Sequence, residues 1–334
     1  MNKNSTLLLK TSLLLLGVIF ICSFGFNTST AATSSTIYVS TQGNNSWNGL
    51  NSTYIGGING PKATIKNATG TVTSGGTVSI GGGTYNENSI GISKNMTIIG
   101  AGQNSTIING TQSGTIFYIA SGVNANISNL TVTNGKTTGN AGGIYNYGNL
   151  TVTNCKFTGN SAGYGGAIFN EQGGTLTETG NTFQNNTATN KGGAIYNNGV
   201  TSNNNSIFKQ NSASNGNGGA IYNQGTLTVT QTSFQNNTAT YNGGAIFNSG
   251  TLSGSGTFTS NNAPMGGAIF NQGTITETNN TFQNNRSTSG YGGAVLNDGA
   301  GILTLNQCQF NSNTADNGYG GAIFNQGVIT LNGS

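Results

Sequence analysis

The chain has 334 residues, enough for one or two ordinary domains. Only 5% of the residues are charged, against roughly 25% in a typical soluble domain, whereas 56 residues are glycine and much of the rest is Asn, Thr and Ser. The net charge is +4, too small for the basic surface of a nucleic-acid-binding protein, and the absence of histidine excludes His-based catalytic triads.

Residues 1–32 predict a cleaved secretory signal peptide. The segment begins with a basic stretch, continues with the apolar run Leu13–Phe26 and reaches small residues at Ala32. The apolar run is short for a membrane-spanning helix, which needs about 20 residues. We therefore expect a secreted or cell-surface protein without a membrane span in the mature chain; an uncleaved anchor is the alternative.

Residues 33–76 are expected to form an N-terminal segment and a cap, and residues 77–334 the main body of the fold. The stretch "PKATIKNATGTV" (Pro61–Val72) predicts a short capping helix with Ile65 and Ala68 facing inward. A cap is needed because a stack of strands exposes unpaired edges at its ends.

A unit of about 25 residues repeats most clearly from residue 142 to 334. Two residues after the hydrophobe of each "GGAI"-type motif stands an asparagine: Asn146, Asn170, Asn197, Asn223, Asn248, Asn271, Asn297 and Asn325. Three residues after each repeated phenylalanine stands another: Asn160, Asn186, Asn211, Asn237, Asn261, Asn285 and Asn313. The chain stops before the phenylalanine that its last repeat predicts, which indicates a fragment or a missing partner.

Each repeat predicts short strands, for example "AIYN", "TLTVT" and "SFQNN". A unit of this size cannot bury its apolar face alone, but stacked units can. Helix-forming residues are scarce, and the leucine-rich-repeat pattern is absent. The sequence therefore predicts an all-β, right-handed, single-stranded parallel β-helix. Because a primary amide both donates and accepts hydrogen bonds, the two asparagine series predict hydrogen-bonded ladders between coils.

The "GGAI" and "FxxN" motifs resemble the repeat of the chlamydial polymorphic outer membrane proteins. The opening "IYVSTQGNNSWNGL" followed by "GGTVSIGGGTYNE" resembles the start of pectate-lyase-like β-helices. The combination is most similar to the adhesin-like surface proteins of methanogenic archaea. The resemblance covers about Ile37 to the end and implies a right-handed β-helix displayed outside the cell.

The acidic residues give little support for catalysis. Glu178 and Glu277 share a register but lie four coils apart, on the order of 19 Å, whereas glycosidases need two carboxylates about 5–10 Å apart. Glu171 and Glu178 fall within one coil, which leaves a carbohydrate-active enzyme as the alternative. We expect all the acidic residues to be solvated surface charges, and we expect no enzyme activity, cofactor or metal site.

The two cysteines of the repeats occupy one ladder position, six coils apart. We expect Cys155 and Cys308 to stay unpaired, because about 29 Å of stacked coils separates them and a disulfide spans less than about 7 Å between Cα atoms.

Two surface stripes are candidates for binding. Strand alternation predicts that the residue after each "GGAI" hydrophobe faces outward, as an exposed aromatic platform for glycans or a partner protein: Tyr145, Phe169, Tyr196, Tyr222, Phe247, Phe270 and Phe324. The alternative is that these rings are covered by turns or pack only on each other. Thr-x-Thr pairs form the second stripe, a minor indication of ice binding, broken at Ser202, Asn203 and Gly254. The leading hypothesis is a non-catalytic adhesin or stalk.

Overall fold

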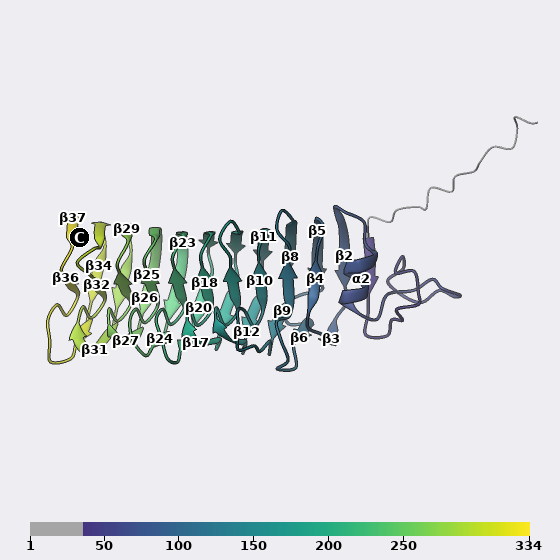
Figure 1. Cartoon of the computed structure of the whole chain (residues 1–334), viewed down its shortest axis with the longest axis horizontal. Helices are drawn as coiled ribbons and strands as arrows, with labels where there is room; N and C mark the ends of the chain where they lie inside the picture. Colours follow the sequence, from purple (N-terminus) through teal and green to yellow (C-terminus); the bar gives the residue numbers. More distant parts are fainter. Residues whose placement is uncertain (1–35) are drawn as a thin grey trace, which may run out of the picture. The chain divides into compact units, whose positions relative to one another are not determined.

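The computed structural model describes residues 36–334, and the predicted signal peptide lies outside the described residues. The described chain forms 37 strands in three parallel sheets and one short helix (Figure 1). Each complete coil between β1 (Thr36–Val39) and β37 (Val328–Asn332) contributes two strand segments to a twenty-stranded sheet and one strand to a ten-stranded sheet, and the coils from β11 (Asn149–Thr153) onward add one to a seven-stranded sheet.

The twenty-stranded sheet contains β1 Thr36–Val39, β2 Gly76–Ile80, β3 Gly83–Asn86, β5 Met96–Gly100, β6 Thr106–Asn109, β8 Asn124–Ser128, β9 Thr131–Thr133, β11 Asn149–Thr153, β12 Lys156–Thr158, β15 Thr175–Thr179, β16 Thr182–Gln184, β19 Val200–Asn204, β20 Ile207–Lys209, β23 Thr226–Gln235, β26 Thr251–Thr259, β29 Thr274–Thr278, β30 Thr281–Gln283, β33 Ile302–Asn306, β34 Gln309–Asn311 and β37 Val328–Asn332. The ten-stranded sheet contains β4 Ile90–Ile92, β7 Phe117–Ile119, β10 Ile144–Asn146, β14 Ile168–Asn170, β18 Ile195–Asn197, β22 Ile221–Asn223, β25 Ile246–Asn248, β28 Ile269–Asn271, β32 Val295–Asn297 and β36 Ile323–Asn325. The seven-stranded sheet contains β13 Ser161–Tyr164, β17 Thr187–Lys191, β21 Ser212–Ala213, β24 Thr238–Ala239, β27 Asn262–Met265, β31 Arg286–Tyr291 and β35 Thr314–Ala315.

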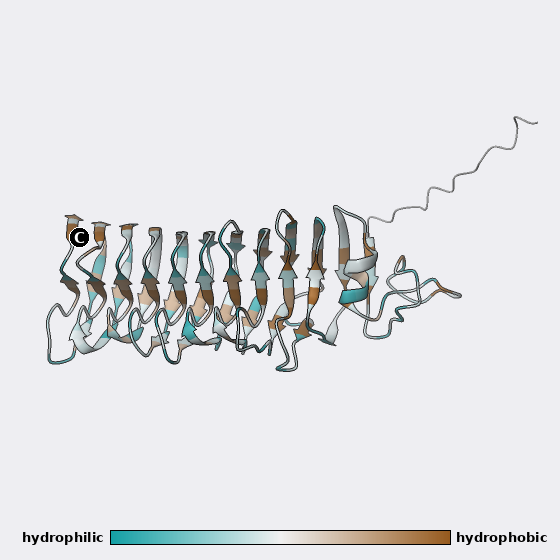
Figure 2. Cartoon of the chain, in the orientation of Figure 1, coloured by the Kyte–Doolittle hydropathy of each residue, from teal (hydrophilic) through white to brown (hydrophobic). Residues whose placement is uncertain are grey.

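Successive "GGAI" strands stack in parallel and in register, which confirms the predicted parallel β-helix. Ile195 of β18 lies between Ile168 of β14 and Ile221 of β22, and the asparagines follow the same alignment. The repeated phenylalanines form a second column inside the stack, with neighbouring ring centroids 4.6–5.0 Å apart. The core therefore consists of columns of like residues (Figure 2).

The glycine pair of each repeat allows this close stacking. Gly218 adopts a left-handed φ of +69°, which costs glycine little. A Cβ added to the next residue, Gly219, would lie 2.1 Å from the carbonyl oxygen of Gly244 in the following coil. The first glycine thus makes the turn, and the second brings the two backbones together.

Both predicted asparagine ladders are confirmed. In the "GGAI" series, Nδ2 of Asn170 donates to Oδ1 of Asn197 at 2.9 Å and to the carbonyl oxygens of Gly174 and Val200. The side-chain bonds continue without a break from Asn146 to Asn325.

The second series, from Asn160 to Asn313, is equally continuous. There Oδ1 of each asparagine also accepts from the backbone N–H of the preceding one, as Asn211 does from Asn186 at 3.1 Å.

Helix α2, Ile65–Thr71, covers the N-terminal end and buries Ile65 and Ala68, as predicted. The carboxylate of Glu87 accepts hydrogen bonds from the N–H groups of Ile65 and Lys66, which otherwise lack partners at a helix start. Strand pairing begins earlier than residue 77, because β1 pairs in parallel with β2.

Glu178 and Glu277 lie fully buried inside the stack, so the expectation that they are surface charges is wrong. In the register of the twenty-stranded sheet they occupy the inward position that Val152, Val229 and Leu305 fill in other coils. Both oxygens of Glu178 lack a partner, whereas Glu277 accepts a hydrogen bond from Nδ2 of Asn280. Desolvation raises the pKa of Glu178 well above its usual value and that of Glu277 to about 7.

Replacing Asn197 by Ala is expected to destabilise the chain by about 1–3 kcal/mol, because it leaves buried amide and carbonyl groups of the adjacent coils without partners. Urea unfolding followed by circular dichroism measures this loss, and Asn223→Ala should behave alike. Asn204→Ala, at an exposed position of β19, is the matched control. Equal midpoints for all three variants and the parent would show that the ladder does not stabilise the stack.

Stability is expected to fall as the pH rises from 4.5 towards 7. The pKa of Glu277 is raised from 4.5 to about 7 in the folded chain, so its carboxyl stays neutral when folded but ionises when unfolded. The effect is absent below pH 4.5 and reaches about 3 kcal/mol near pH 7.

Urea midpoints at several pH values test this expectation. Glu277→Gln should remove this part of the pH dependence. A parent profile that rises with pH over this range would contradict the assignment.

Candidate functional site

The residues that follow the "GGAI" hydrophobes form one continuous column along the ten-stranded sheet, which we call the aromatic column. Strand register extends it beyond the recognised repeats: Gly91, Tyr118, Tyr145, Phe169, Tyr196, Tyr222, Phe247, Phe270, Leu296 and Phe324. Its later members form a cluster separate from the main core, so their side chains point away from the interior, as strand alternation predicts.

The expected exposed platform is wrong for most of this column. Phe169 is only 7% exposed, and Tyr222, Phe247 and Phe270 are 5% exposed. From Phe169 to Phe270 neighbouring rings stack with centroids 4.6–5.2 Å apart. The rings therefore cover one another, and side chains from the seven-stranded sheet add further cover.

Lys191 and Met265 show how that cover is made. Nζ of Lys191 lies 4.4 Å from the ring centroid of Tyr222 and donates to its hydroxyl at 3.1 Å. Met265 packs against the buried part of the column. Tyr145, Tyr196 and Phe324 are half-buried.

The column becomes accessible near its N-terminal end. Tyr118 is 39% exposed and Tyr147 is 41% exposed. Tyr147 stacks on Tyr145 with ring centroids 4.4 Å apart, and Tyr118 lies 6.3 Å from Tyr145. We call these three residues the tyrosine cluster.

The sequence analysis missed Tyr118 and Tyr147, because neither stands directly after a "GGAI" hydrophobe. The alternation in "IFYIA", with buried Phe117 and Ile119 on either side of an outward tyrosine, was the available indication for Tyr118.

Hydrogen bonds hold the central ring of the tyrosine cluster in place. The hydroxyl of Tyr145 accepts from Nδ2 of Asn140 at 3.0 Å and donates to Oε2 of Glu171 at 2.9 Å. Burial raises the pKa of the Tyr145 hydroxyl above its usual value, so this group remains a neutral donor. The cluster thus combines ring faces with an amide and a carboxylate at its edge.

Glu171 and Glu178 do not face a common space. Glu171 lies at the tyrosine cluster, whereas Glu178 is enclosed in the core. The arrangement therefore lacks the pair of carboxylates on either side of a bond that glycosidases use. Among residues 36–334, no group of three or more Cys, Asp or Glu side chains is placed to hold a metal ion. Cys155 and Cys308 are buried and free, as expected.

The outward Thr-x-Thr stripe is more continuous than the sequence indicates. Asn203 and Gly254 stand in the inward register of Val229, so they do not interrupt the outer surface. Ser202 and Ser253 continue the hydroxyl column of Thr228 there.

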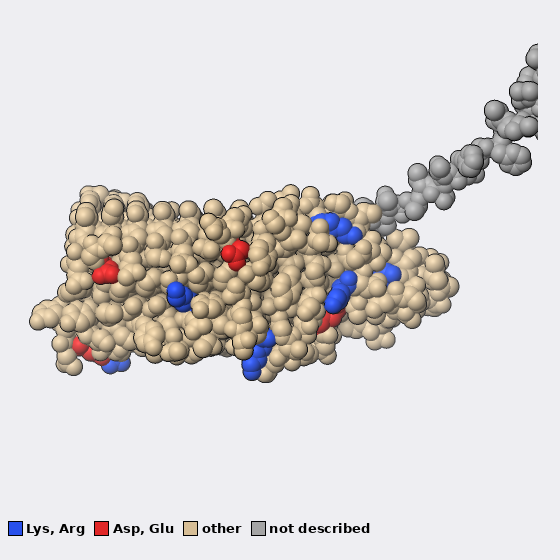
Figure 3. Space-filling model, viewed as in Figure 1, with Lys and Arg blue, Asp and Glu red and all other residues tan. Residues whose placement is uncertain are grey.

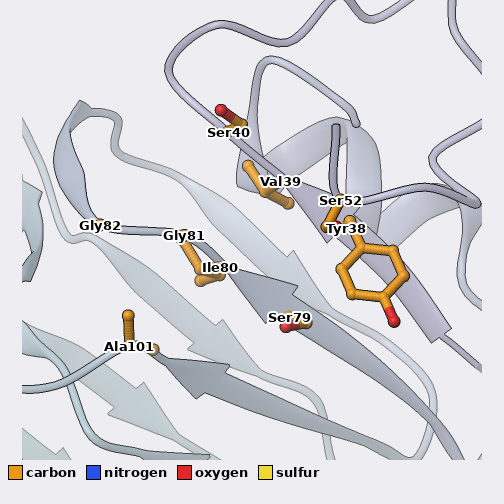
Figure 4. Close-up of a pocket in the computed structure, with 10 residues that line it drawn as sticks. Tyr38, Val39, Ser40, Ser52, Ser79, Ile80, Gly81, Gly82 and Ala101 are labelled. Atoms are coloured by element: carbon orange, nitrogen blue, oxygen red, sulfur yellow. The ribbon is translucent and has the colours of Figure 1, made fainter. Parts of the chain in front are cut away.

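A surface pocket of about 300 Å³ lies at the N-terminal end of the stack (Figure 4). Its lining comprises Tyr38, Ser40, Ser52 and Ser79 with the apolar or small residues Val39, Ile80, Gly81, Gly82, Gly100 and Ala101. The lining offers hydroxyl groups, one ring and backbone groups, and contains no acidic or basic side chain.

Comparison with known proteins agrees with the repeat resemblance. Five segments, residues 154–171, 182–198, 205–224, 231–249 and 307–326, match the Chlamydia polymorphic membrane protein repeat and together make up less than a third of the chain. No curated protein matches the chain.

Several solved structures share part of the backbone path at low identity. The pectin methylesterase PemA from Erwinia chrysanthemi is 12% identical, with a TM-score of 0.46, over 75% of this chain and 79% of its own. Pectin methylesterase from carrot is 10% identical, with a TM-score of 0.45, over 88% and 87%. ORF18 of Geobacillus virus E2 is 14% identical, with a TM-score of 0.46, over 99% and 63%.

Within the described residues, no helix is long and apolar enough to cross a membrane. In five segments the chain carries repeats of the Chlamydia polymorphic membrane protein type, and these repeats form part of a parallel β-solenoid.

Proposed function

We propose that the chain is a non-catalytic protein displayed outside the cell, where it acts as a stalk and an adhesin. The matched membrane-protein repeat supports this proposal, as does the predicted export segment at residues 1–32. The resemblance to the adhesin-like surface proteins of methanogenic archaea belongs to the same proposal.

The observation that carries the stalk role is the continuity of the stack. Both asparagine ladders run through every recognised repeat, from Asn146 to Asn325 and from Asn160 to Asn313. Each coil contacts mainly its neighbours, so the length of such a protein grows with the number of repeats. A rod of this kind holds a binding site away from the surface that bears it.

The surroundings of the six acidic residues support the non-catalytic part. Glu87 caps helix α2, Glu171 binds the hydroxyl of Tyr145, and Glu178 and Glu277 are buried in the core. Asp298 accepts from the side-chain amide of Gln272, and Asp316 pairs with Arg286 at 2.5 Å. Each of the six carboxylates therefore either makes a contact within the chain or is buried in the core. The face in Figure 3 shows only scattered charges.

Two measurements on the full-length protein test this proposal. Protease treatment of intact cells that produce it should degrade the protein and lower cell attachment to the natural surface. Incubation of the purified protein with pectin, polygalacturonate and β-glucans should release neither reducing ends nor methanol. Sustained turnover of any of these polymers would refute the non-catalytic role and favour the carbohydrate-active alternative.

Ice binding is a second candidate, because the outward hydroxyl column continues through Ser202 and Ser253. A flat, uncharged and periodic hydroxyl surface is the feature on which it depends. Ice-recrystallisation assays of the purified protein, with Thr228→Lys as the disrupting variant, test this candidate. Recrystallisation that proceeds as in buffer alone would remove it.

A further inference from the structure

The aromatic column ends at Gly91, one coil before Tyr118 in the chain. Gly91 of β4 stands in register with Tyr118 of β7, and β4 is the last strand of the ten-stranded sheet on this side. A Cβ added to Gly91 would meet no atom within 4 Å. At Gly91, one coil before Tyr118, the column therefore has an open place where most other coils carry a ring; β4 lies towards the N-terminal end of the stack (Figure 1).

Among residues 36–334, no ring therefore packs against Tyr118 on the Gly91 side. From Phe169 to Phe270 the chain fills the equivalent positions with its own stacked rings at centroid spacings of 4.6–5.2 Å, and Tyr118 lies 6.3 Å from Tyr145 on its other side. Buried rings gain from such packing, so a flat ligand with an apolar face would gain in the same way over Gly91.

We propose that the tyrosine cluster, together with the open place over Gly91, binds an uncharged β-linked chain of glucose-type sugars. In such sugars the ring hydroxyls are equatorial, so each ring presents C–H groups on its faces and hydroxyls around its edge. The inference deepens the proposed adhesin function and rests on it, because it names the ligand class and the binding residues.

The surroundings of the tyrosine cluster suit this ligand. Tyr118 and Tyr147 supply exposed ring surface, and tyrosine combines an apolar body with a polar end. Asn140 supplies a side-chain amide and Glu171 a carboxylate beside Tyr145, and both types of group bind hydroxyls. Because Glu171 repels negative charge, the cluster disfavours uronates and other acidic sugars.

Filling the open place is the sharpest test. In Gly91→Phe, whose Cβ would meet no atom within 4 Å, the new ring should pack beside Tyr118 and occupy the position proposed for the sugar. The variant should fold with a urea midpoint equal to or above that of the parent. Its affinity for cellohexaose and chitohexaose, measured by isothermal titration calorimetry on the full-length protein, should fall at least tenfold.

Truncation of the tyrosines should have the same effect on binding. Tyr118→Ser and Tyr147→Ser should each lower the affinity for the two hexamers about tenfold. Tyr241→Ser is the matched control, because Tyr241 is 51% exposed and its hydroxyl donates to Asn215 outside the cluster; it should bind like the parent. A hexamer of galacturonate is the charged probe, and it should bind at least tenfold more weakly than either neutral hexamer.

The proposal is overturned if the parent binds neither neutral hexamer, or if a folded Gly91→Phe binds within twofold of the parent. It is also overturned if galacturonate binds as tightly as the neutral hexamers. These outcomes leave the adhesin function standing if cell attachment persists. Turnover of a polymer by the parent, in contrast, refutes the non-catalytic function whichever residues bind the sugar.

Discussion

Hydrogen bonding between identical side-chain amides on successive coils is the interaction on which the rest of the structure depends. Nδ2 of Asn170 reaches one amide oxygen and two backbone carbonyls, so a shift of one residue in the register would leave all three bonds unmade. Because such groups are costly to bury unpaired, the ladders hold each coil at the same register as the next. The stacked phenylalanines and the glycine turns require that alignment.

Low charge is a consequence of this mode of assembly. Like residues stand directly above one another about 4.8 Å apart, so a charge repeated in every coil would form a column of mutually repelling groups. Neutral amides, hydroxyls and rings avoid this penalty, and amides and rings also attract their own copies. The outside of the stack therefore offers rings, amides and hydroxyls for contacts, and the tyrosine cluster combines exposed rings with an amide and a carboxylate.

The two core carboxylates show how alternation within a strand outweighs residue type. Glu178 follows Leu176 by two residues, and Glu277 follows Ile275 by two, so each shares the inward face of its strand. Strict inward–outward alternation along the two strands would place both side chains inside, although acidic residues are generally exposed. Inside the stack, desolvation raises the pKa of each carboxyl, which favours its neutral form.

The sequence by itself determined the parallel stacking, the register and both asparagine ladders. Neighbouring coils have nearly the same sequence, so the same contact between equivalent residues recurs in every repeat. It also determined that the side chains after the "GGAI" hydrophobes point away from the core. Only the tertiary structure decided which of these rings are exposed. Lys191 and Met265 cover the later rings from another sheet, whereas Gly91 and Tyr118, which lie outside the recognised repeats, leave the earlier end open. Exposure depends on what the neighbouring coils place above a residue, and the repeat motif does not contain that information.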